Sequence, residues 1–287
     1  MEIGFIGTGV MGGSMVNHLL EADYNVHVFN RTKEKAMPYV EKGATWQDTP
    51  ADIARASDVV FTIVGYPSDV EQVYMNGDGV FEGLSEGKTI IDMTTSTPAL
   101  AEEIAAKATE LGASSLDAPV SGGDIGAKEG TLTIMVGGNK DAFDDMKPIM
   151  EEFSSELRHF GPAGSGQHTK MANQIMVAGT MTGMIEMFAY AEEAGLELSE
   201  VIKTVNGGAA QNRSLGNYGT RIIAEDYTPG FFVKHFVKDL RIALDEAEKM
   251  GIKLYATEQA FDLYRRLEEL GHGDDGTQAL IKLWWDD

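Results

Sequence analysis

The N-terminal stretch Glu2-Ile3-Gly4-Phe5-Ile6-Gly7-Thr8-Gly9-Val10-Met11-Gly12 decides the fold class of this 287-residue chain. A short apolar run ends at Ile6, and an amphipathic helical pattern starts at Met11. In this strand–turn–helix context, the three glycines permit a tight turn, a close approach of pyrophosphate to the backbone, and close packing of the helix. The N–H groups at the start of the helix can bind phosphate. We therefore predict that a dinucleotide binds Gly7, Thr8, Gly9, Val10, Met11 and Gly12.

β-rich runs and helical stretches alternate through the first half of the chain, which indicates βαβ units and a parallel sheet. After residue 161 the β-rich runs disappear, and long helical patterns end at glycines such as Gly195 and Gly251. We predict an α/β fold, with a Rossmann-type doubly wound sheet over residues 1–161 and an all-α substrate and oligomerisation domain over residues 162–287. The predicted strands span 3–6, 24–29, 58–64, 89–93, 115–118, 131–136 and 157–160, and the long C-terminal helices span 170–193, 198–205, 237–250 and 254–270.

The second predicted strand ends at Phe29-Asn30-Arg31-Thr32, where the ribose of a dinucleotide would lie. Sites that prefer NAD usually carry Asp or Glu here, to accept a hydrogen bond from the ribose 2′-hydroxyl. This chain has a neutral Asn30 and a cationic Arg31 instead. A guanidinium can pair with a 2′-phosphate, so we predict that NADP(H) is preferred and that NAD(H) remains possible.

Two later segments carry candidate substrate contacts. Asp117-Ala118-Pro119-Val120-Ser121-Gly122-Gly123 follows a short strand and places a hydroxyl beside two glycines, whose N–H groups suit a small carboxylate. Lys170 lies about one turn inside the first long helix, and helical spacing puts Asn173, Gln174 and Val177 on the same face. A lysine with two carboxamides suits a site where negative charge develops on oxygen.

The composition excludes several classes of partner and chemistry. A net charge of -22 argues against nucleic acid and anionic membranes, since both need clustered Lys and Arg. The absence of cysteine excludes disulfides and thiol catalysis, and the six histidines lack the spacing of metal ligands. There is no basic n-region or cleavage site and no apolar run long enough to span a membrane, so we expect a cytoplasmic protein without a metal.

Taken together, the segments resemble the β-hydroxyacid dehydrogenase family, which includes 3-hydroxyisobutyrate dehydrogenase and tartronate semialdehyde reductase. The resemblance covers essentially the whole chain and rests on Gly7–Gly12 with Met15, Asp92–Thr95 with Pro98, Asp117–Gly123, Gly164–Gln174 and Lys238-Asp239-Leu240. It implies that Lys170 is catalytic, that Ser121, Gly122, Gly123, Asn173 and Gln174 bind the substrate, and that Val64, Thr95 and Lys238 lie near the nicotinamide. Two departures are Asn173-Gln174, where many members have two asparagines, and the loop Val64-Gly65-Tyr66-Pro67, often Met-Leu-Pro.

The resulting hypothesis is an oxidoreductase that transfers a hydride between NADP(H) and a small carboxylate-bearing β-hydroxy or oxo acid. Candidate substrates are tartronate semialdehyde, methylmalonate semialdehyde, succinic semialdehyde and glyoxylate. The long helix that starts near Lys170 is long enough to contribute to the interface of a homodimer or homotetramer. Two alternatives remain: an imine reductase on the same architecture, and a non-catalytic NADP-binding interaction module.

Overall fold

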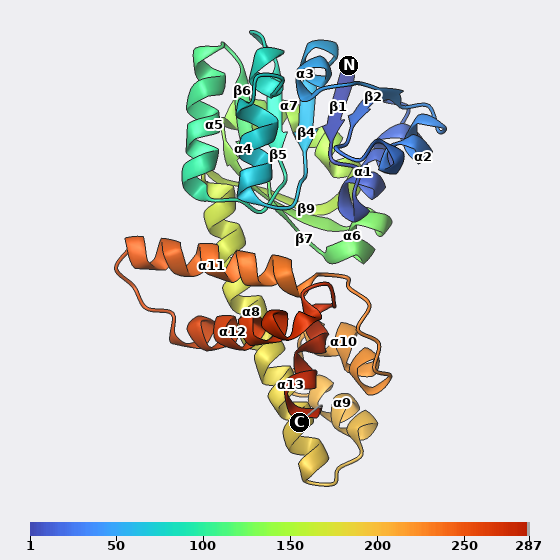
Figure 1. Ribbon diagram of the computed structural model, residues 1–287, viewed down its shortest axis with the longest axis vertical. Coiled ribbons are helices and arrows are strands. Elements are labelled where there is room, and N and C mark those ends of the chain that lie inside the picture. The colour runs from blue at the N-terminus through green and yellow to red at the C-terminus, as the bar shows by residue number, and fades with distance from the viewer. Residues whose placement is uncertain (286–287) are drawn as a thin grey trace. The chain divides into compact units, whose positions relative to one another are not determined.

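The computed structural model describes residues 1–285 and divides into two compact units, Met1–Lys170 and Met171–Asp287 (Figure 1). The last strand of the N-terminal unit, β9, ends at Gly161. Helix α8 (Ser165–Glu193) begins in the first unit and continues into the second.

A mixed sheet organises the N-terminal unit, with strand order β3-β2-β1-β4-β5-β6-β8-β7 and with β9 paired to β8. The six strands from β3 to β6 run parallel, as predicted, whereas β8 runs antiparallel to β6 and β7. The sequence did not predict this reversal, which follows a short helix, α6, in place of a full crossover. The strands are β1 Glu2–Ile6, β2 Asn25–Phe29, β3 Thr45–Trp46, β4 Val59–Thr62, β5 Thr89–Asp92, β6 Ser114–Asp117, β7 Val120–Ser121, β8 Leu132–Gly138 and β9 Ser154–Gly161.

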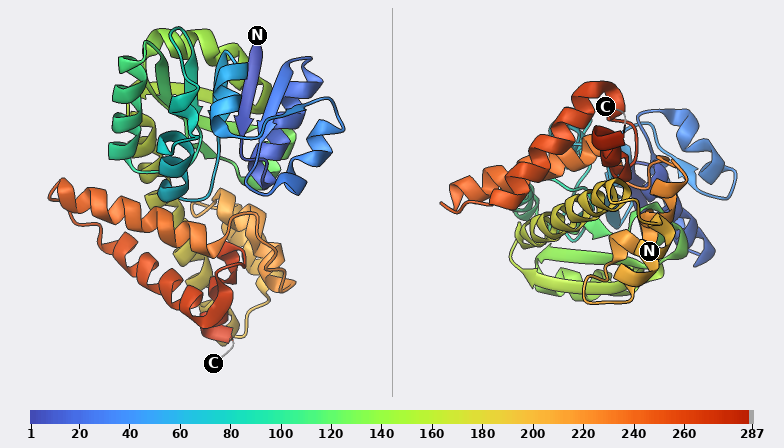
Figure 2. Two further views of the ribbon diagram at one scale, coloured as in Figure 1. Left: turned by 45° about the horizontal axis from the view of Figure 1, so that its top comes forward. Right: turned by 90° about the horizontal axis from the view of Figure 1, so that it is seen from below.

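Alternate residues of a strand point to opposite faces of its sheet. Helices cover both faces of the sheet (Figures 1 and 2). Phe5 of β1 packs with Leu19 of α1 in one core, whereas Ile6 packs with Ile53 of α3 and Tyr74 of α4 in the other. A strand that is buried on both faces needs apolar residues at successive positions, which explains the continuous β-rich runs of the sequence.

Helix α1 begins at Val10, one residue before the predicted start at Met11. Thr97 and Asn139 cap α5 and α7 through their side chains. Pro148 lies inside α7, which gives way to a 3₁₀ turn at Glu151. The helices are α1 Val10–Glu21, α2 Met37–Val40, α3 Pro50–Ala56, α4 Pro67–Met75, α5 Pro98–Glu110, α6 Gly123–Glu129 and α7 Lys140–Met150, with 3₁₀ turns at Lys33–Lys35, Val80–Glu82 and Glu151–Phe153.

The described part of the C-terminal unit is built from helices, as predicted. Phe236 and Tyr264 meet in its core with ring centroids 4.8 Å apart, beside Phe188 of α8. Helix α10 was not predicted, and α11 begins at Val233 rather than Val237. The helices are α9 Leu198–Asn206, α10 Arg213–Ile223, α11 Val233–Lys249, α12 Tyr255–Leu267 and α13 Lys282–Trp285, with a π turn at Glu268–His272 and a 3₁₀ turn at Thr277–Ile281. Within residues 1–285, no helix is long and apolar enough to span a bilayer.

Candidate active site

The glycine turn between β1 and α1 has the geometry that the sequence predicts for a phosphate-binding turn. Gly7 has φ of +99°, and a Cβ there would lie 2.0 Å from the Ile63 carbonyl oxygen. A Cβ at Gly12 would lie 1.9 Å from the Gly7 carbonyl oxygen, so the start of α1 packs tightly on the turn. A Cβ at Gly9 would meet nothing within 4 Å. The turn is therefore closed toward the protein and open at Gly9, where a phosphate could approach the backbone.

The residues around Gly9 fit a dinucleotide in two further respects. The first-turn N–H groups of α1, which begins at Val10, have no intrahelical acceptor and can bind phosphate. Thr8 is buried, and among residues 1–285 its Oγ1 has no hydrogen-bond partner. A buried hydroxyl without a partner is costly unless a ligand satisfies it. Its backbone N–H donates to Asn30 Oδ1 at 3.0 Å.

The end of β2 places Arg31 at the surface, with 84% of its side chain exposed. Asn30 is a scaffold residue, because its amide donates to the Thr32 carbonyl oxygen while its oxygen accepts from Thr8. Arg31 Nη1 lies 3.2 Å from Asp69 Oδ1, near the start of α4. This ion pair could not be predicted from a local pattern of residues, since Asp69 lies 38 residues away from Arg31.

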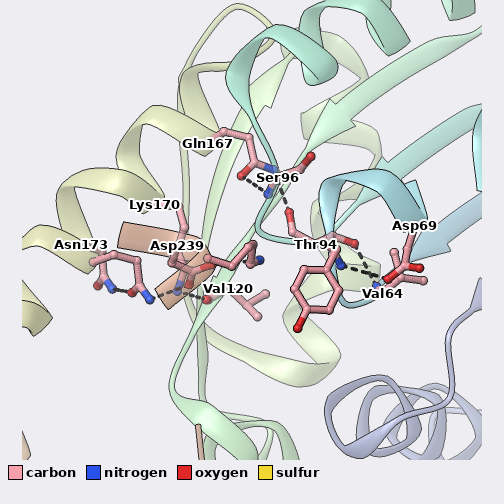
Figure 3. Close-up of polar contacts among 12 residues, drawn as sticks. Val64, Asp69, Thr94, Ser96, Val120, Gln167, Lys170, Asn173 and Asp239 are labelled. Carbon is pink, nitrogen blue, oxygen red and sulfur yellow. Dashed lines mark hydrogen bonds and ion pairs between the residues drawn. The ribbon is translucent and has the colours of Figure 1, made fainter. Parts of the chain in front are cut away.

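The residues predicted near the nicotinamide come from the carboxyl ends of two neighbouring parallel strands. The Val64 N–H, just after β4, donates to Thr94 Oγ1 at 3.0 Å, and Thr94 follows β5 (Figure 3). Thr95, the next residue, is half-buried. The carboxyl ends of parallel strands are the usual binding edge of such a sheet. The third predicted residue, Lys238, belongs to the C-terminal unit.

Lys170 lies beside the loop that is predicted to bind a carboxylate. Its Nζ donates to the Val120 carbonyl oxygen at 2.8 Å, and Ser121 is the next residue along the chain (Figure 3). The side chain is only 6% exposed, unlike that of a typical surface lysine. The structure thus brings Lys170 together with the segment from Val120 to Gly123.

Gly122 and Gly123 follow Ser121 with φ of +134° and +67°. These values leave the region that other residues adopt easily, so the turn depends on both glycines. Gly123 is the first residue of α6, and Ser121, Gly122 and Gly123 are all half-buried. Backbone N–H groups in such a turn can converge on an anion.

The remaining predicted residues form a hydrogen-bonded chain within the C-terminal unit. The Asn173 amide donates to Gln174 Oε1 at 2.7 Å, and the Gln174 amide donates to Asp239 Oδ2 at 2.7 Å. Lys238 Nζ pairs with Asp239 Oδ1 at 2.9 Å. Asp239 is 1% exposed and contacts both Gln174 and Lys238, while Asn173 is linked to it through Gln174. No local pattern of residues predicts a role for Asp239, because its contact with Gln174 spans 65 residues.

The described residues include no group of three or more His, Asp or Glu placed to hold a metal ion. The ionisable group that stands out near Lys170 is Asp117, at the end of β6. Burial raises the pKa of the Asp117 carboxyl to about 6, although backbone N–H groups of Gln167 and Gly164 partly oppose the shift. Asp117 was not predicted as a site residue, because its hydrogen-bond partners Gly164 and Gln167 lie 47 and 50 residues away.

Known proteins that resemble this chain identify its family. A family model described as the NAD binding domain of 6-phosphogluconate dehydrogenase matches residues 2–161, and one for NADP-dependent 3-hydroxyisobutyrate dehydrogenase matches residues 164–284. The chain belongs to the β-hydroxyacid dehydrogenase family. It is an NAD(P)-dependent hydroxyacid dehydrogenase, which confirms the resemblance and removes the non-catalytic module from consideration.

The relatives cover nearly the whole chain. A probable 3-hydroxyisobutyrate dehydrogenase-like protein of Arabidopsis thaliana is 48% identical over 98% of this chain and 84% of its own length. The 2-hydroxy-3-oxopropionate reductase of Escherichia coli is 36% identical over 98% of this chain and 96% of its own. The structure of 3-hydroxyisobutyrate dehydrogenase from Salmonella typhimurium matches with a TM-score of 0.90 and 27% identity over 99% of both chains. An imine reductase from Streptomyces aurantiacus, at 21% identity and a TM-score of 0.68 over 99% of both chains, shares the fold alone.

Proposed function

We propose that this dehydrogenase reduces a small semialdehyde or other oxo acid, or oxidises the corresponding β-hydroxy acid, with NADP(H) preferred over NAD(H). Tartronate, methylmalonate and succinic semialdehyde are the candidate substrates, and a 3-hydroxyisobutyrate-like acid is the candidate for oxidation. The named E. coli relative acts on 2-hydroxy-3-oxopropionate, which supports a three-carbon oxo acid among them.

The observation that carries the proposal is the contact between Lys170 Nζ and the Val120 carbonyl oxygen, 2.8 Å long. It puts an ammonium group one residue from the Ser121–Gly123 turn, within the same compact unit. An anion held by the N–H groups of that turn would therefore have a cation close by. Such an arrangement suits a substrate with a carboxylate at one end and a reacting carbonyl at the other.

Lys170 would act on the oxygen of that carbonyl. The nicotinamide supplies or accepts the hydride when the cofactor is bound. In reduction, negative charge develops on the substrate oxygen, and the Lys170 ammonium would stabilise this charge and donate the proton. In oxidation the neutral amine would accept the proton. Asn173, three residues further along α8, lies on the same helical face and would donate a hydrogen bond to the substrate.

The preference for NADP(H) rests on Arg31. The end of β2 itself carries no Asp or Glu for a ribose 2′-hydroxyl, and Asn30 is engaged with the backbone of Thr8 and Thr32. At the end of β2, where the ribose of a bound dinucleotide would lie, the Arg31 guanidinium is exposed and pairs with Asp69. A 2′-phosphate would draw it into a charge-assisted contact.

The imine reductase alternative predicts a different dependence on substrate charge. An imine reductase needs no carboxylate on its substrate, whereas the proposed site binds the substrate through one. We expect succinic semialdehyde to be reduced with a much higher kcat/KM than its methyl ester, in an assay of NADPH oxidation. Equal kcat/KM values for the acid and the ester would contradict the proposed carboxylate site and favour the alternative.

We further propose that the protein is a homodimer or homotetramer and acts in the cytoplasm on a free small molecule. The surface of α8 supports self-association, because Met176 and Tyr190 are 68% and 76% exposed on a helix that is apolar on several sides. Light scattering should give a mass of two or four times 31.1 kDa. A monomer mass at micromolar concentration would contradict the proposal.

A further inference from the structure

A buried carboxylate holds the start of the helix that carries Lys170. Asp117, the last residue of β6, is 3% exposed. Its Oδ1 accepts from the Gly164 N–H at 2.9 Å, and its Oδ2 accepts from the Gln167 N–H at 2.8 Å. The N–H groups at a helix start lack intrahelical acceptors, and negative charge is favoured there. One side chain, 47 residues or more away in sequence, thus satisfies two of these donors.

The space around this carboxylate leaves the helix little freedom to shift. A Cβ at Gly166 would lie 2.8 Å from Asp117 Oδ2 and 2.4 Å from the Asp117 carbonyl oxygen. A Cβ at Gly137 of β8 would lie 2.5 Å from Asp117 Oδ1. The first turn of α8 therefore packs directly on the backbone of β6 and β8, and only glycine fits at the two contact points.

The same turn fixes a second loop of the candidate site. The Gln167 side chain accepts from the Ser96 N–H at 3.0 Å and donates to the Thr94 carbonyl oxygen at 2.8 Å, and it is fully buried (Figure 3). These two residues flank Thr95, which is predicted to lie near the nicotinamide. The start of α8 is thus tied both to the end of β6 and to the loop after β5.

These contacts close a ring that includes Lys170. Gln167 and Lys170 are three residues apart, so they lie on one face of α8. Lys170 Nζ reaches the Val120 carbonyl oxygen, and Val120 lies three residues after Asp117. Two hydrogen bonds, from Gln167 to Asp117 and from Lys170 to Val120, thus link two chain segments, residues 117–120 and 167–170, into a closed ring. A shift of the helix start would move the ammonium relative to Ser121 and Gly122.

We propose that Asp117 is a positioning residue for Lys170: its carboxylate sets the place and rotation of the first turns of α8, and so holds the ammonium at the Ser121–Gly123 turn. The inference rests on the proposed catalytic role of Lys170. Burial that raises the pKa of Asp117 to about 6 means that the protein keeps this carboxylate ionised at neutral pH at a cost in stability. A residue needed only to fill space would not need the charge.

The test compares Asp117→Asn and Asp117→Ala with Asn139→Ala. Asn139 caps α7 in the same unit by accepting from the Ala142 N–H at 2.8 Å, so its loss removes a helix cap away from Lys170. For each variant, kcat and KM are measured with the best semialdehyde of the substrate panel, together with NADPH affinity by fluorescence and the melting temperature. A misplacement of about 1 Å can lower a rate by about 100-fold. We expect kcat to fall about 10-fold for the Asn variant and about 100-fold for the Ala variant, with NADPH affinity within about twofold.

The control Asn139→Ala should have a lower melting temperature than the wild type but a kcat within about twofold of it. If Asp117→Ala does not fold, the isosteric Asp117→Asn decides. A kcat within twofold of wild type in the folded Asp117 variants, or a loss of kcat matched by Asn139→Ala, would overturn the inference. Lys170→Met, measured alongside, separates the two proposals. If Lys170→Met keeps its kcat, the proposed catalytic site is wrong; if it loses kcat while the Asp117 variants do not, only the positioning role is wrong.

Discussion

Replacing Asp117 with Asn should change how the stability of the protein depends on pH. Burial raises the pKa of this carboxyl from an ordinary value of 3.8 to about 6 in the folded state. The folded protein therefore binds the proton more tightly than the unfolded chain does. As pH rises from about 4 to about 6, the unfolded chain loses its proton first, so stability falls over this range.

The size of this change in stability follows from the shift in the pKa of Asp117. A difference of about 2 pKa units corresponds to roughly 3 kcal/mol between full protonation and full ionisation. Part of the titration lies outside the range from pH 4.5 to pH 7.5. Within this range, ionisation of Asp117 lowers the free energy of unfolding by about 2 kcal/mol. Asn carries no charge at either pH, so the variant should lack this contribution, while other titrating groups act alike in both proteins.

Urea unfolding at pH 4.5, 6.0 and 7.5 measures the difference. We expect the free energy of unfolding of the wild type, relative to that of Asp117→Asn, to decrease by about 2 kcal/mol from pH 4.5 to pH 7.5. Asn139→Ala removes a helix cap without removing a charge, so its values should run parallel to those of the wild type. Parallel values for Asp117→Asn would refute the reasoning, because they would mean that Asp117 has an ordinary pKa in the folded protein.

Three further predictions concern the candidate site. Lys170→Ala should lower kcat by about 10²–10⁴-fold with NADPH affinity nearly unchanged, as the loss of a general acid does; a near-normal kcat would rule out the catalytic role. Arg31→Ala should lower the ratio of kcat/KM for NADPH to that for NADH about 10- to 150-fold, whereas Asp69→Asn should raise it, and a constant ratio in both variants would exclude Arg31 as the discriminator. Gly122→Ala, which places a Cβ at φ of +134° and 3.1 Å from a Leu132 methyl, should raise KM for the acid more than for its methyl ester; an equal rise would count against carboxylate binding there.

The sequence predicted those features whose causes lie close together along the chain. The Gly7–Gly12 turn follows from a strand, three glycines and a helix within about 20 residues, and the structure shows the closed and open glycine positions that this pattern implies. Helix caps at Thr97 and Asn139 were predictable for the same reason, since each bonds to an N–H three residues ahead.

Features that depend on distant residues were not predictable in this way. Helix α8 begins at Ser165 rather than Lys170, and the Gln167 N–H of its first turn donates to Asp117 of strand β6. Asp239 became part of the candidate site through Gln174, 65 residues earlier. Side-chain hydrogen bonds of this kind form only once packing brings the two segments together, and no local pattern of residues encodes them.

The ion pair between Arg31 and Asp69 affects how each form of the cofactor would bind. Its contact with Asp69 is exposed, and exposed ion pairs contribute about 0–1 kcal/mol, whereas a charge-assisted hydrogen bond to a phosphate is worth about 1.5–3 kcal/mol. A 2′-phosphate would therefore displace the carboxylate. When NAD(H) binds, Arg31 can keep its contact with Asp69, so NAD(H) binding is not penalised. The proposed preference for NADP(H) would then arise only from the added phosphate contact, which would limit it to about 150-fold and leave NAD(H) a usable cofactor.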